Sequence, residues 1–224
     1  MIILHENLQK EAERVASTFE EVYKIKSELL NESLEGIFKP IPEFEGFSES
    51  ADKIWYVLKS ILNKAVLVIT DRDIYADNKS KEDDWVFGYC VGNLSLASLS
   101  RLKRQDSQPS RKIEIPMESY LKRIDLLSLH EIGHDVVKAK HFELAKWINA
   151  KTGKELALGH HCTDNKCAMY EIVDVNSPPK EQGYMLLGNQ RVYDAGIENI
   201  LERIYPNWFC NRCSESIVID EKYN

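Results

Sequence analysis

The sequence predicts an α/β protein, α+β in the stricter sense, built on a twisted, mostly parallel sheet with an antiparallel edge strand and covering helices. From Met1 to Thr70, short apolar runs alternate with helical stripes in the order β-α-β-α-β, which is typical of a parallel sheet. Two further apolar runs flank a Gly-Asn pair, as in a hairpin. The last third of the chain has few strand patterns and holds four of the five cysteines, which indicates a smaller subdomain stabilised by metal.

The N-terminal part is expected to supply the parallel strands and two helices. The predicted strands are short and apolar: Met1–His5, Ile25–Leu30 and Ala65–Thr70. Apolar side chains recur at helical spacing in residues 8–22 and 54–62, which predicts the helices. Pro40, Pro42 and Gly46 predict a loop over residues 31–50.

The middle of the chain is expected to form a hairpin and then a long helix. The hairpin strands are Trp85–Val91 and Leu94–Leu99, and Cys90 is interpreted as a buried residue of the first strand. Residues 101–112 are polar and rich in basic side chains, which favours a solvated loop. A helix is predicted to begin at Pro116 and to continue through His134, because its apolar residues keep the helical period.

Composition excludes several classes of protein. The length of 224 residues suits one domain, or one domain divided by a cleft, and 43% hydrophobic residues suffice for a core. A net charge of −7 argues against a general nucleic-acid-binding protein. No apolar run approaches the roughly 18 residues of a membrane span, and the first residues show no signal-peptide pattern. We therefore expect a cytoplasmic monomer that binds neither nucleic acid nor membranes.

The segment His130-Glu131-Ile132-Gly133-His134 contains the residues for catalysis. Residues four apart on a helix project from one face, so His130 and His134 can bind one zinc ion at about 2.0–2.1 Å. Glu131 is rotated by roughly 100° from His130 and would lie beside such a metal. There it can act as a general base on a water acidified by zinc and can pass the proton to a leaving amine. The pattern therefore predicts a zinc-dependent hydrolase.

Four cysteines form two close pairs, Cys162 with Cys167 and Cys210 with Cys213. Without a secretory signal, such pairs indicate metal ligands rather than disulfides. Four thiolates make a closed tetrahedral site, which suits a structural zinc ion and not catalysis.

From His130 onward the sequence resembles the archaemetzincins, a family of metzincin-like zinc peptidases. Their pattern is H-E-x-x-H-x-x-G-x-x-H-C-x4-C-x-M, followed later by C-x-x-C. The segments that match it are His130–His134, residues 161–169 and Cys210–Cys213. Upstream, residues 68–73, 85–88 and 98–102 look like sheet segments of the same family in the same order. The likeness covers nearly the whole chain and indicates a divergent member with insertions.

The resemblance implies two zinc ions per chain. One is catalytic and bound by three histidines, with Glu131 as the general base, and the other is structural and bound by four cysteines. The implied structural ligands are Cys162, Cys167, Cys210 and Cys213.

The resemblance also implies how the fold is organised around the catalytic metal. Met169 matches the methionine whose turn lies beneath the metal in metzincins, where we expect a packing role. Trp85–Val91 would be the sheet edge along which an extended peptide binds. The single catalytic domain, 1–224, would then consist of an upper α/β subdomain, 1–137, and a lower subdomain, 138–224, with the cysteine site.

The third zinc-binding histidine is where the sequence departs from the family pattern. The family position holds a lysine here, so His141, His160 and His161 are the candidates. On an unbroken helix His141 would lie about 10 Å along the axis from His134, and one ion cannot reach both. We predict His161 as the third ligand because it directly precedes Cys162, with His160 or His141 as alternatives. His141 is interpreted as a surface or packing residue.

Two insertions are expected to border the cleft. The chain beyond the motif predicts a break near residues 135–140 and then a separate inserted helix at about 138–152, ended by Thr152-Gly153. The 40 residues between Met169 and Cys210 exceed the family's spacing, with loops predicted at 178–179 and 183–188 and a helix at 195–204. A tyrosine nearby could stabilise an oxyanion. The candidates are Tyr170, Tyr184 and Tyr193.

The main hypothesis is a zinc-dependent peptidase that acts on peptide or protein substrates, with aminopeptidase and endopeptidase activity left open. One rival is a catalytically degenerate binding module that holds only the structural zinc ion. Another is a zincin of a different class, with an acidic third ligand such as Glu155 or Glu171.

Overall fold

The computed structural model describes residues 1–33, 46–47, 63–75, 85–105, 114–172, 175, 181, 183–192 and 196–223. The chain divides into two compact units. Unit 1 comprises Met1–Lys103, Leu127–Val136 and Val218–Asn224, and unit 2 comprises Arg104–Leu126 and Val137–Ile217. The sequence predicts a boundary between residues 137 and 138. The chain passes from unit 1 to unit 2 between Val136 and Val137, one residue earlier. The helix predicted at 54–62 and the loop predicted at 178–179 lie outside the described residues.

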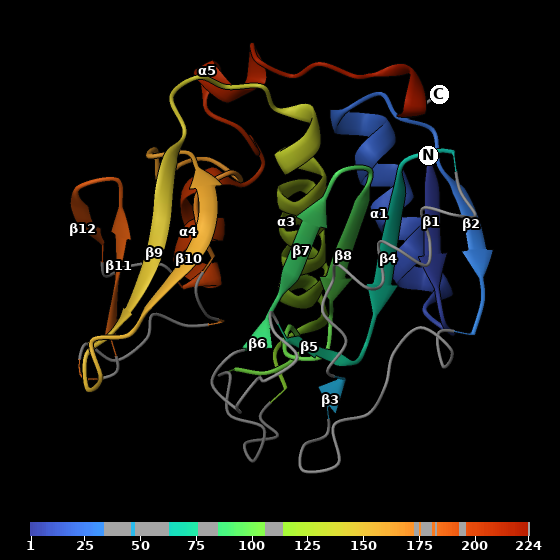
Figure 1. Ribbon diagram of the computed structural model, residues 1–224. Helices are drawn as coiled ribbons and strands as arrows, with labels where there is room; N and C mark the ends of the chain where they lie inside the picture. The colour runs from blue at the N-terminus through green and yellow to red at the C-terminus, as the bar shows by residue number, and fades with distance from the viewer. Residues whose placement is uncertain are drawn as a thin grey trace. The chain divides into compact units, whose positions relative to one another are not determined.

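Unit 1 is built on a five-stranded sheet in the order β2-β1-β4-β8-β7 (Figure 1). The strands are β1 (Ile2–His5), β2 (Glu28–Asn31), β4 (Val66–Thr70), β7 (Gly88–Val91) and β8 (Leu94–Ser98). β1 pairs in parallel with β2 and β4, and β4 pairs in parallel with β8. β7 runs antiparallel to β8 at the edge. The mostly parallel sheet with an antiparallel edge strand is therefore confirmed.

A second, small sheet in unit 1 joins β3 (Gly46–Phe47), β5 (Asp73–Tyr75) and β6 (Trp85–Val86). The run Trp85–Val91, predicted as one strand, is thus divided between two sheets. The part that forms the edge of the five-stranded sheet is β7 alone.

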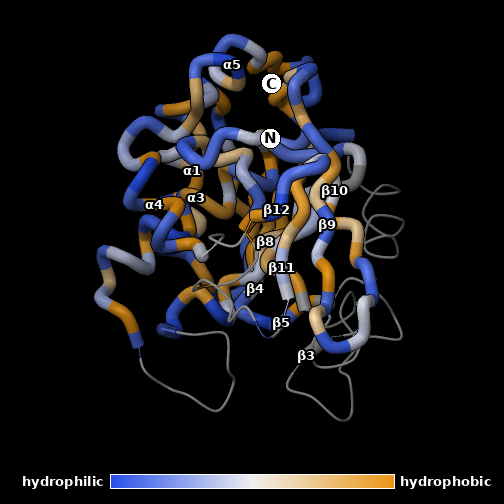
Figure 2. The backbone as a smooth tube through the Cα atoms, turned by 90° about the vertical axis from the view of Figure 1, so that its left-hand side faces the viewer, coloured by the Kyte–Doolittle hydropathy of each residue, from blue (hydrophilic) through white to orange (hydrophobic). Residues whose placement is uncertain are grey.

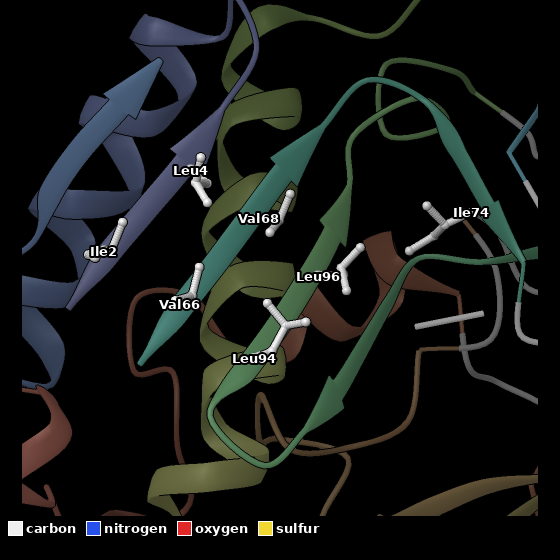
Figure 3. Packing of buried hydrophobic residues seen from close by; sticks show 7 residues of the cluster. All are labelled: Ile2, Leu4, Val66, Val68, Ile74, Leu94 and Leu96. Atoms are coloured by element: carbon white, nitrogen blue, oxygen red, sulfur yellow. The ribbon is translucent and has the colours of Figure 1, made fainter. Parts of the chain in front are cut away.

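Both faces of the five-stranded sheet are buried, as near-continuous apolar strands require. Alternate residues form a cluster on one face: Ile2, Leu4, Val66, Val68, Leu94 and Leu96, with Ile74 of β5 (Figure 3). The intervening residues Ile3 and Leu67 are also fully buried. Each such side chain contributes about 1.5–3 kcal/mol to folding relative to exposure.

Within the described part of unit 1, helix α1 (Gln9–Val22) and the end of helix α3 (Met117–Val136) lie beside the sheet. Helix α1 lies against β1 and β2 and buries the stripe Ala12, Val15 and Phe19, as its helical spacing predicts. Helix α3 contributes its last part, Leu127–Val136, to this unit. The Ser95 hydroxyl of β8 donates to the Glu131 carbonyl at 3.3 Å, so this part of α3 lies on the face opposite Leu94 and Leu96.

The start of the loop predicted as solvated at 101–112 is buried instead. The Arg101 guanidinium donates two hydrogen bonds of 2.9 Å to the Asp73 carboxylate. This pair joins the chain after β8 to β5, and the paired geometry offsets the cost of burying the two charges.

Helix α3 ends at Val136 because the chain then becomes extended and pairs with the C-terminal segment. The Val136 carbonyl accepts from the Val218 amide at 2.8 Å, and Lys138 donates to the Ser216 carbonyl at 2.9 Å. The break predicted near residues 135–140 is confirmed.

Unit 2 contains a four-stranded antiparallel sheet in the order β10-β9-β11-β12. The strands are β9 (Glu143–Asn149), β10 (Glu155–His161), β11 (Gly183–Leu187) and β12 (Gln190–Val192). The inserted helix predicted at 138–152 is wrong, because this stretch forms β9 and the turn after it. The loop predicted at 183–188 is also wrong, since most of it forms β11.

The turn between β9 and β10 shows why the helix prediction failed. The Asn149 side chain accepts hydrogen bonds from the amides of Lys151 and Thr152 at 2.9 and 3.0 Å. Gly153 has a φ of 67°, which favours glycine, and its amide donates to the Asn149 carbonyl. The Thr152-Gly153 pair interpreted as a helix stop is the end of a hairpin turn. The apolar positions of this stretch, Leu144, Ala145, Trp147 and Ile148, recur at helical spacing, so the local pattern favoured a helix. Figure 2 shows that hydrophilic and hydrophobic residues both occur along β9.

Three short helical elements complete the chain: α4 (Ile197–Ile204), α5 (Asn211–Ser214) and the 3₁₀ turn η1 (Glu221–Tyr223). Helix α4 confirms the prediction at 195–204. Within unit 2, Arg123 of α3 forms an ion pair with Glu198 of α4 and donates to the Arg104 carbonyl at 2.7 Å. None of the helices in the described ranges is long and apolar enough to cross a bilayer.

Candidate metal centres

The described residues include two groups of side chains that could hold a metal ion. The first contains the pair His130 and His134 of unit 1, and the second comprises His141, Cys162, Cys210 and Cys213. The second group belongs entirely to unit 2.

His130 and His134 turn their Nε2 atoms toward each other on the unit 1 part of α3. The two nitrogens lie 3.1 Å apart, and the rings are nearly perpendicular, with centroids separated by 4.7 Å. Two imidazoles bound to one tetrahedral zinc ion would hold their nitrogens about 3.3 Å apart, given bonds of about 2.0–2.1 Å. The pair therefore fits a shared zinc ion, as the four-residue spacing predicts.

Glu131 is buried and lies against β7, the edge strand of the five-stranded sheet. A β-carbon added at Gly88 of β7 would overlap the Glu131 carboxylate and would lie 2.6 Å from its Cγ. The Glu131 backbone carbonyl accepts from Ser95 on the neighbouring strand. The side chain and main chain of Glu131 are thus positioned by β7 and β8, and this arrangement needs a residue without a side chain at position 88.

The last turn of α3 is anchored by Asp135. The Tyr223 hydroxyl and the Lys222 ammonium each lie 2.5 Å from Oδ2 of Asp135. Burial raises the pKa of Tyr223 well above its ordinary value, and the hydrogen bond to Asp135 adds a smaller increase. Tyr223 therefore stays a neutral donor and holds the turn that carries His134.

In unit 2, His161 is the last residue of β10, just after a β-bulge. The pairing of β10 with β9 shifts between Ala157 and Gly159, and Gly159 has a φ of 97°, which other residues rarely adopt. Beyond this bulge His160 is exposed and His161 is buried. The geometry of unit 2 thus favours His161 over His160 as a residue with an interior role.

The carboxylate of Glu171 lies beside His161, with Oε2 at 2.5 Å from Nε2. Glu155 lies at the opposite end of β10 and forms an ion pair of 3.0 Å with Lys146. Glu155 and His161 are six positions apart, which corresponds to about 20 Å along a strand. Of the two acidic ligands considered from the sequence, only Glu171 lies near a candidate histidine of its unit.

Met169 lies in a buried turn beside Cys162 and Cys167, the first pair of cysteines. Its side chain is fully buried, and its carbonyl accepts from the Cys162 amide at 2.8 Å. The Tyr170 amide donates to the Cys167 carbonyl at 2.9 Å, which closes the turn. These bonds place Met169 behind the end of β10, next to the residue that follows His161.

The second centre gathers sulfur atoms and one imidazole. The Sγ atoms of Cys162 and Cys210 lie 3.8 Å apart. Nε2 of His141 lies 3.2 Å from Sγ of Cys162 and 3.5 Å from Sγ of Cys213. His141 was interpreted from the sequence as a surface or packing residue, and this is wrong, because its ring nitrogen faces the cysteines.

Cys167 also belongs to this cluster through hydrogen bonds to other thiols. The pKa of Cys162 is lowered, chiefly because Cys167 and then Cys213 donate hydrogen bonds to its sulfur. The same hydrogen bonds raise the pKa of Cys167 and Cys213. Cysteine sulfurs gathered around an imidazole are a donor set that suits zinc.

The sequence could have revealed the role of His141 through the hairpin turn. The Asn149–Gly153 turn pairs Glu143 with His161. That register brings His141 close to Cys162.

The remaining candidates have no evident catalytic role in the described structure. Tyr170 is buried, Tyr184 stacks under the Arg191 guanidinium at 3.6 Å, and Tyr193 lies outside the described residues. Cys90 lies on β7, where burial raises the pKa of its thiol to about 12. Cys90 is therefore a protonated thiol and not a nucleophile at neutral pH.

Solved structures share this architecture over nearly the whole chain. An archaemetzincin from Methanopyrus kandleri matches with a TM-score of 0.54 and 18% identity, covering 96% of this chain and 91% of the other. An archaemetzincin from Archaeoglobus fulgidus, complexed with malonate, matches with a TM-score of 0.55 and 19% identity, covering 97% and 100%. The chain has the archaemetzincin fold. A zinc-dependent peptidase from Methanocorpusculum labreanum also matches, with a TM-score of 0.51 and 15% identity over the full length of both chains.

The archaemetzincin fold is shown by these structures and not by sequence comparison. Neither the protein-family models nor the curated proteins include a match. The mixed α/β architecture, with a mostly parallel sheet, an antiparallel edge and a second small sheet, is the one expected from the motif resemblance.

Proposed function

We propose that this protein is a zinc-dependent peptidase in which His130, His134 and His161 bind one zinc ion and Glu131 is the general base. The observation that carries the proposal is the pair of Nε2 atoms 3.1 Å apart, with a buried carboxylate from the adjacent residue, on an archaemetzincin fold. His161 supports it as the buried histidine at the end of β10, one residue before a cysteine of the second centre.

The chain's own residues supply orientation and proton transfer. A zinc ion bound by the histidines would act as a Lewis acid that polarises the scissile carbonyl and acidifies a water. Glu131, packed against Gly88, accepts the proton of the attacking water and transfers it to the nitrogen of the leaving amine. Peptide binding along β7 would orient the substrate, because an edge strand offers main-chain groups to an extended chain.

Glu171 has a supporting role in this proposal. Metal-binding histidines usually direct their other ring nitrogen to a carboxylate, which fixes the tautomer and the ring orientation. The contact between Glu171 and His161 has this form if His161 binds zinc through Nδ1. Loss of such a partner typically weakens metal binding by about 10–100-fold.

A second candidate assigns the third ligand to Glu171 itself, because its carboxylate lies against Nε2 of His161. Zinc analysis of two variants distinguishes the candidates. We expect His161→Ala to lose the catalytic zinc ion and Glu171→Gln to retain it with weaker affinity. Retention by His161→Ala together with loss by Glu171→Gln would assign the ligand to Glu171.

The peptidase proposal is tested with Glu131→Gln, which keeps the size of the side chain but removes its basicity. The zinc-loaded variant should cleave a peptide library about 10²–10⁴-fold more slowly than the parent chain, with unchanged zinc content. Glu118→Gln is the matched control, because Glu118 is exposed in the first turn of the same helix. Equal cleavage by Glu131→Gln and the parent chain would refute the role of Glu131.

The alternative of a degenerate binding module predicts one zinc ion per chain and no cleavage that depends on Glu131. The peptidase proposal predicts two ions, one in each centre. The expected substrates are peptides or proteins. Exopeptidase or endopeptidase action, the cytoplasmic location and the monomeric state stay predictions.

A further inference from the structure

We infer that His141 is a ligand of the structural zinc ion, which it binds together with Cys162, Cys210 and Cys213. The centre is then a Cys₃His site, and Cys167 lies outside the coordination shell. This differs from the four-cysteine set implied by the resemblance. The inference concerns the structural ion and holds whether or not the chain cleaves peptides.

The distances among the four side chains match the edges of a zinc-centred tetrahedron. Bonds of about 2.3 Å to sulfur and about 2.0–2.1 Å to nitrogen give edges of about 3.8 Å between two sulfurs and about 3.5 Å between nitrogen and sulfur. The Sγ atoms of Cys162 and Cys210 are 3.8 Å apart, and Nε2 of His141 is 3.5 Å from Sγ of Cys213. The contact of 3.2 Å between His141 and Cys162 is slightly shorter. All four ligand atoms lie within 4.8 Å of one another.

Charge favours the imidazole over a fourth thiolate. Three thiolates and one neutral imidazole leave a zinc centre with a net charge of −1, and four thiolates leave −2. Cys162 and Cys213 are fully buried, so the smaller charge has the lower desolvation cost. Cys167, also fully buried, is not one of the four residues whose ligand atoms all lie within 4.8 Å of one another.

The position of His141 in the chain gives this ligand a structural purpose. His141 lies two residues before Glu143, and Glu143 pairs with His161 at the base of the β9–β10 hairpin. Cys162 follows His161 on the other arm. An ion bound by both His141 and Cys162 therefore joins the two arms at the base of the hairpin and restrains the backbone of His161.

X-ray absorption at the zinc edge tests the ligand set directly. The full-length chain is prepared with His130→Ala and His134→Ala, so that the cysteine centre is the remaining zinc site. Three sulfur neighbours at about 2.3 Å and one nitrogen at about 2.0–2.1 Å are expected. Four sulfur neighbours without nitrogen would overturn the inference.

Zinc affinity in the same background provides a second readout, measured by competition with a chromogenic chelator. His141→Ala should weaken zinc binding by at least about 10²-fold, whereas Cys167→Ser should stay within about 3-fold of the parent. His160→Ala is the matched control, because His160 is an exposed histidine of the same hairpin. Weak binding by Cys167→Ser with normal binding by His141→Ala would contradict the inference.

Replacement of His141 by another ligand type separates coordination from packing. His141→Cys should bind zinc and show four sulfur neighbours in the absorption spectrum. If His141 only packs against the centre, His141→Cys should have the zinc affinity of His141→Ala and the zinc absorption spectrum of the parent chain. That result would also overturn the inference.

Discussion

The two candidate metal centres obtain their ligands from the chain in different ways. His130 and His134 are one helical turn apart, so α3 alone sets the distance between their ring nitrogens. The second centre combines His141 with Cys213, which are 72 residues apart in sequence. A local centre can be predicted from spacing, whereas a centre assembled by tertiary structure depends on correctly predicting the elements between its ligands.

The largest expected effect comes from removing a ligand of the local centre. His134→Ala should reduce the zinc content from two ions to one and should lower peptide cleavage by at least the 10²–10⁴-fold typical of losing a general base. The melting temperature should change little, because the ion it removes has no structural role. Elemental analysis and a peptide assay check this, and a variant that keeps two ions would break the comparison.

Removal of a ligand from the second centre should affect stability instead. Cys213→Ser should lose the structural ion and lower the free energy of unfolding by several kcal/mol, less than the roughly 10–16 kcal/mol by which zinc folds isolated fingers. Thermal unfolding with and without a chelator measures this effect. If chelation destabilises the parent chain and Cys213→Ser equally, the ion has no role in holding unit 2 together.

Gly88→Ala should separate the positioning of Glu131 from metal binding. The added methyl group overlaps the carboxylate, so Glu131 must shift, and a shift of about 1 Å can lower kcat by about 10²-fold. The zinc content should stay at the parent's value.

Gly153→Ala is the control for the general effect of replacing a glycine, because Gly153 has a positive φ and nothing within 4 Å of an added β-carbon. It should lose stability and keep its kcat. Normal kcat in Gly88→Ala would show that β7 does not position the general base.

The smallest effect is expected at the hairpin turn. Asn149→Ala removes the acceptor of two backbone hydrogen bonds and should destabilise unit 2 by about 1 kcal/mol. Urea denaturation, followed by fluorescence of Trp147 on β9, reports this change. A decrease in zinc affinity of the second centre in the same variant would sharpen the link between the hairpin and its ligands.

The sequence was sufficient for the parts of the molecule in which local pattern and tertiary structure agree. The parallel strands of unit 1 are buried on both faces and read as apolar runs, and α1 and α3 keep their helical period throughout. For the same reason the spacing of His130 and His134 was enough to predict their arrangement.

The sequence was insufficient where the local pattern and the tertiary structure disagree. Leu144 and Ile148 continue a helical stripe, yet β9 forms because β10 and β11 pair with its two edges. That pairing depends on residues far along the chain and on the turn at Asn149. Once β9 was predicted as a helix, His141 could not be placed beside the cysteines.

Anomalous diffraction at the zinc edge, on crystals grown with zinc, would locate both ions. Two peaks are expected, one beside Nε2 of His130 and His134 and one between His141 and the Sγ atoms of Cys162, Cys210 and Cys213. A single peak at the cysteines, with none beside His130 and His134, would contradict the assignment of two zinc ions.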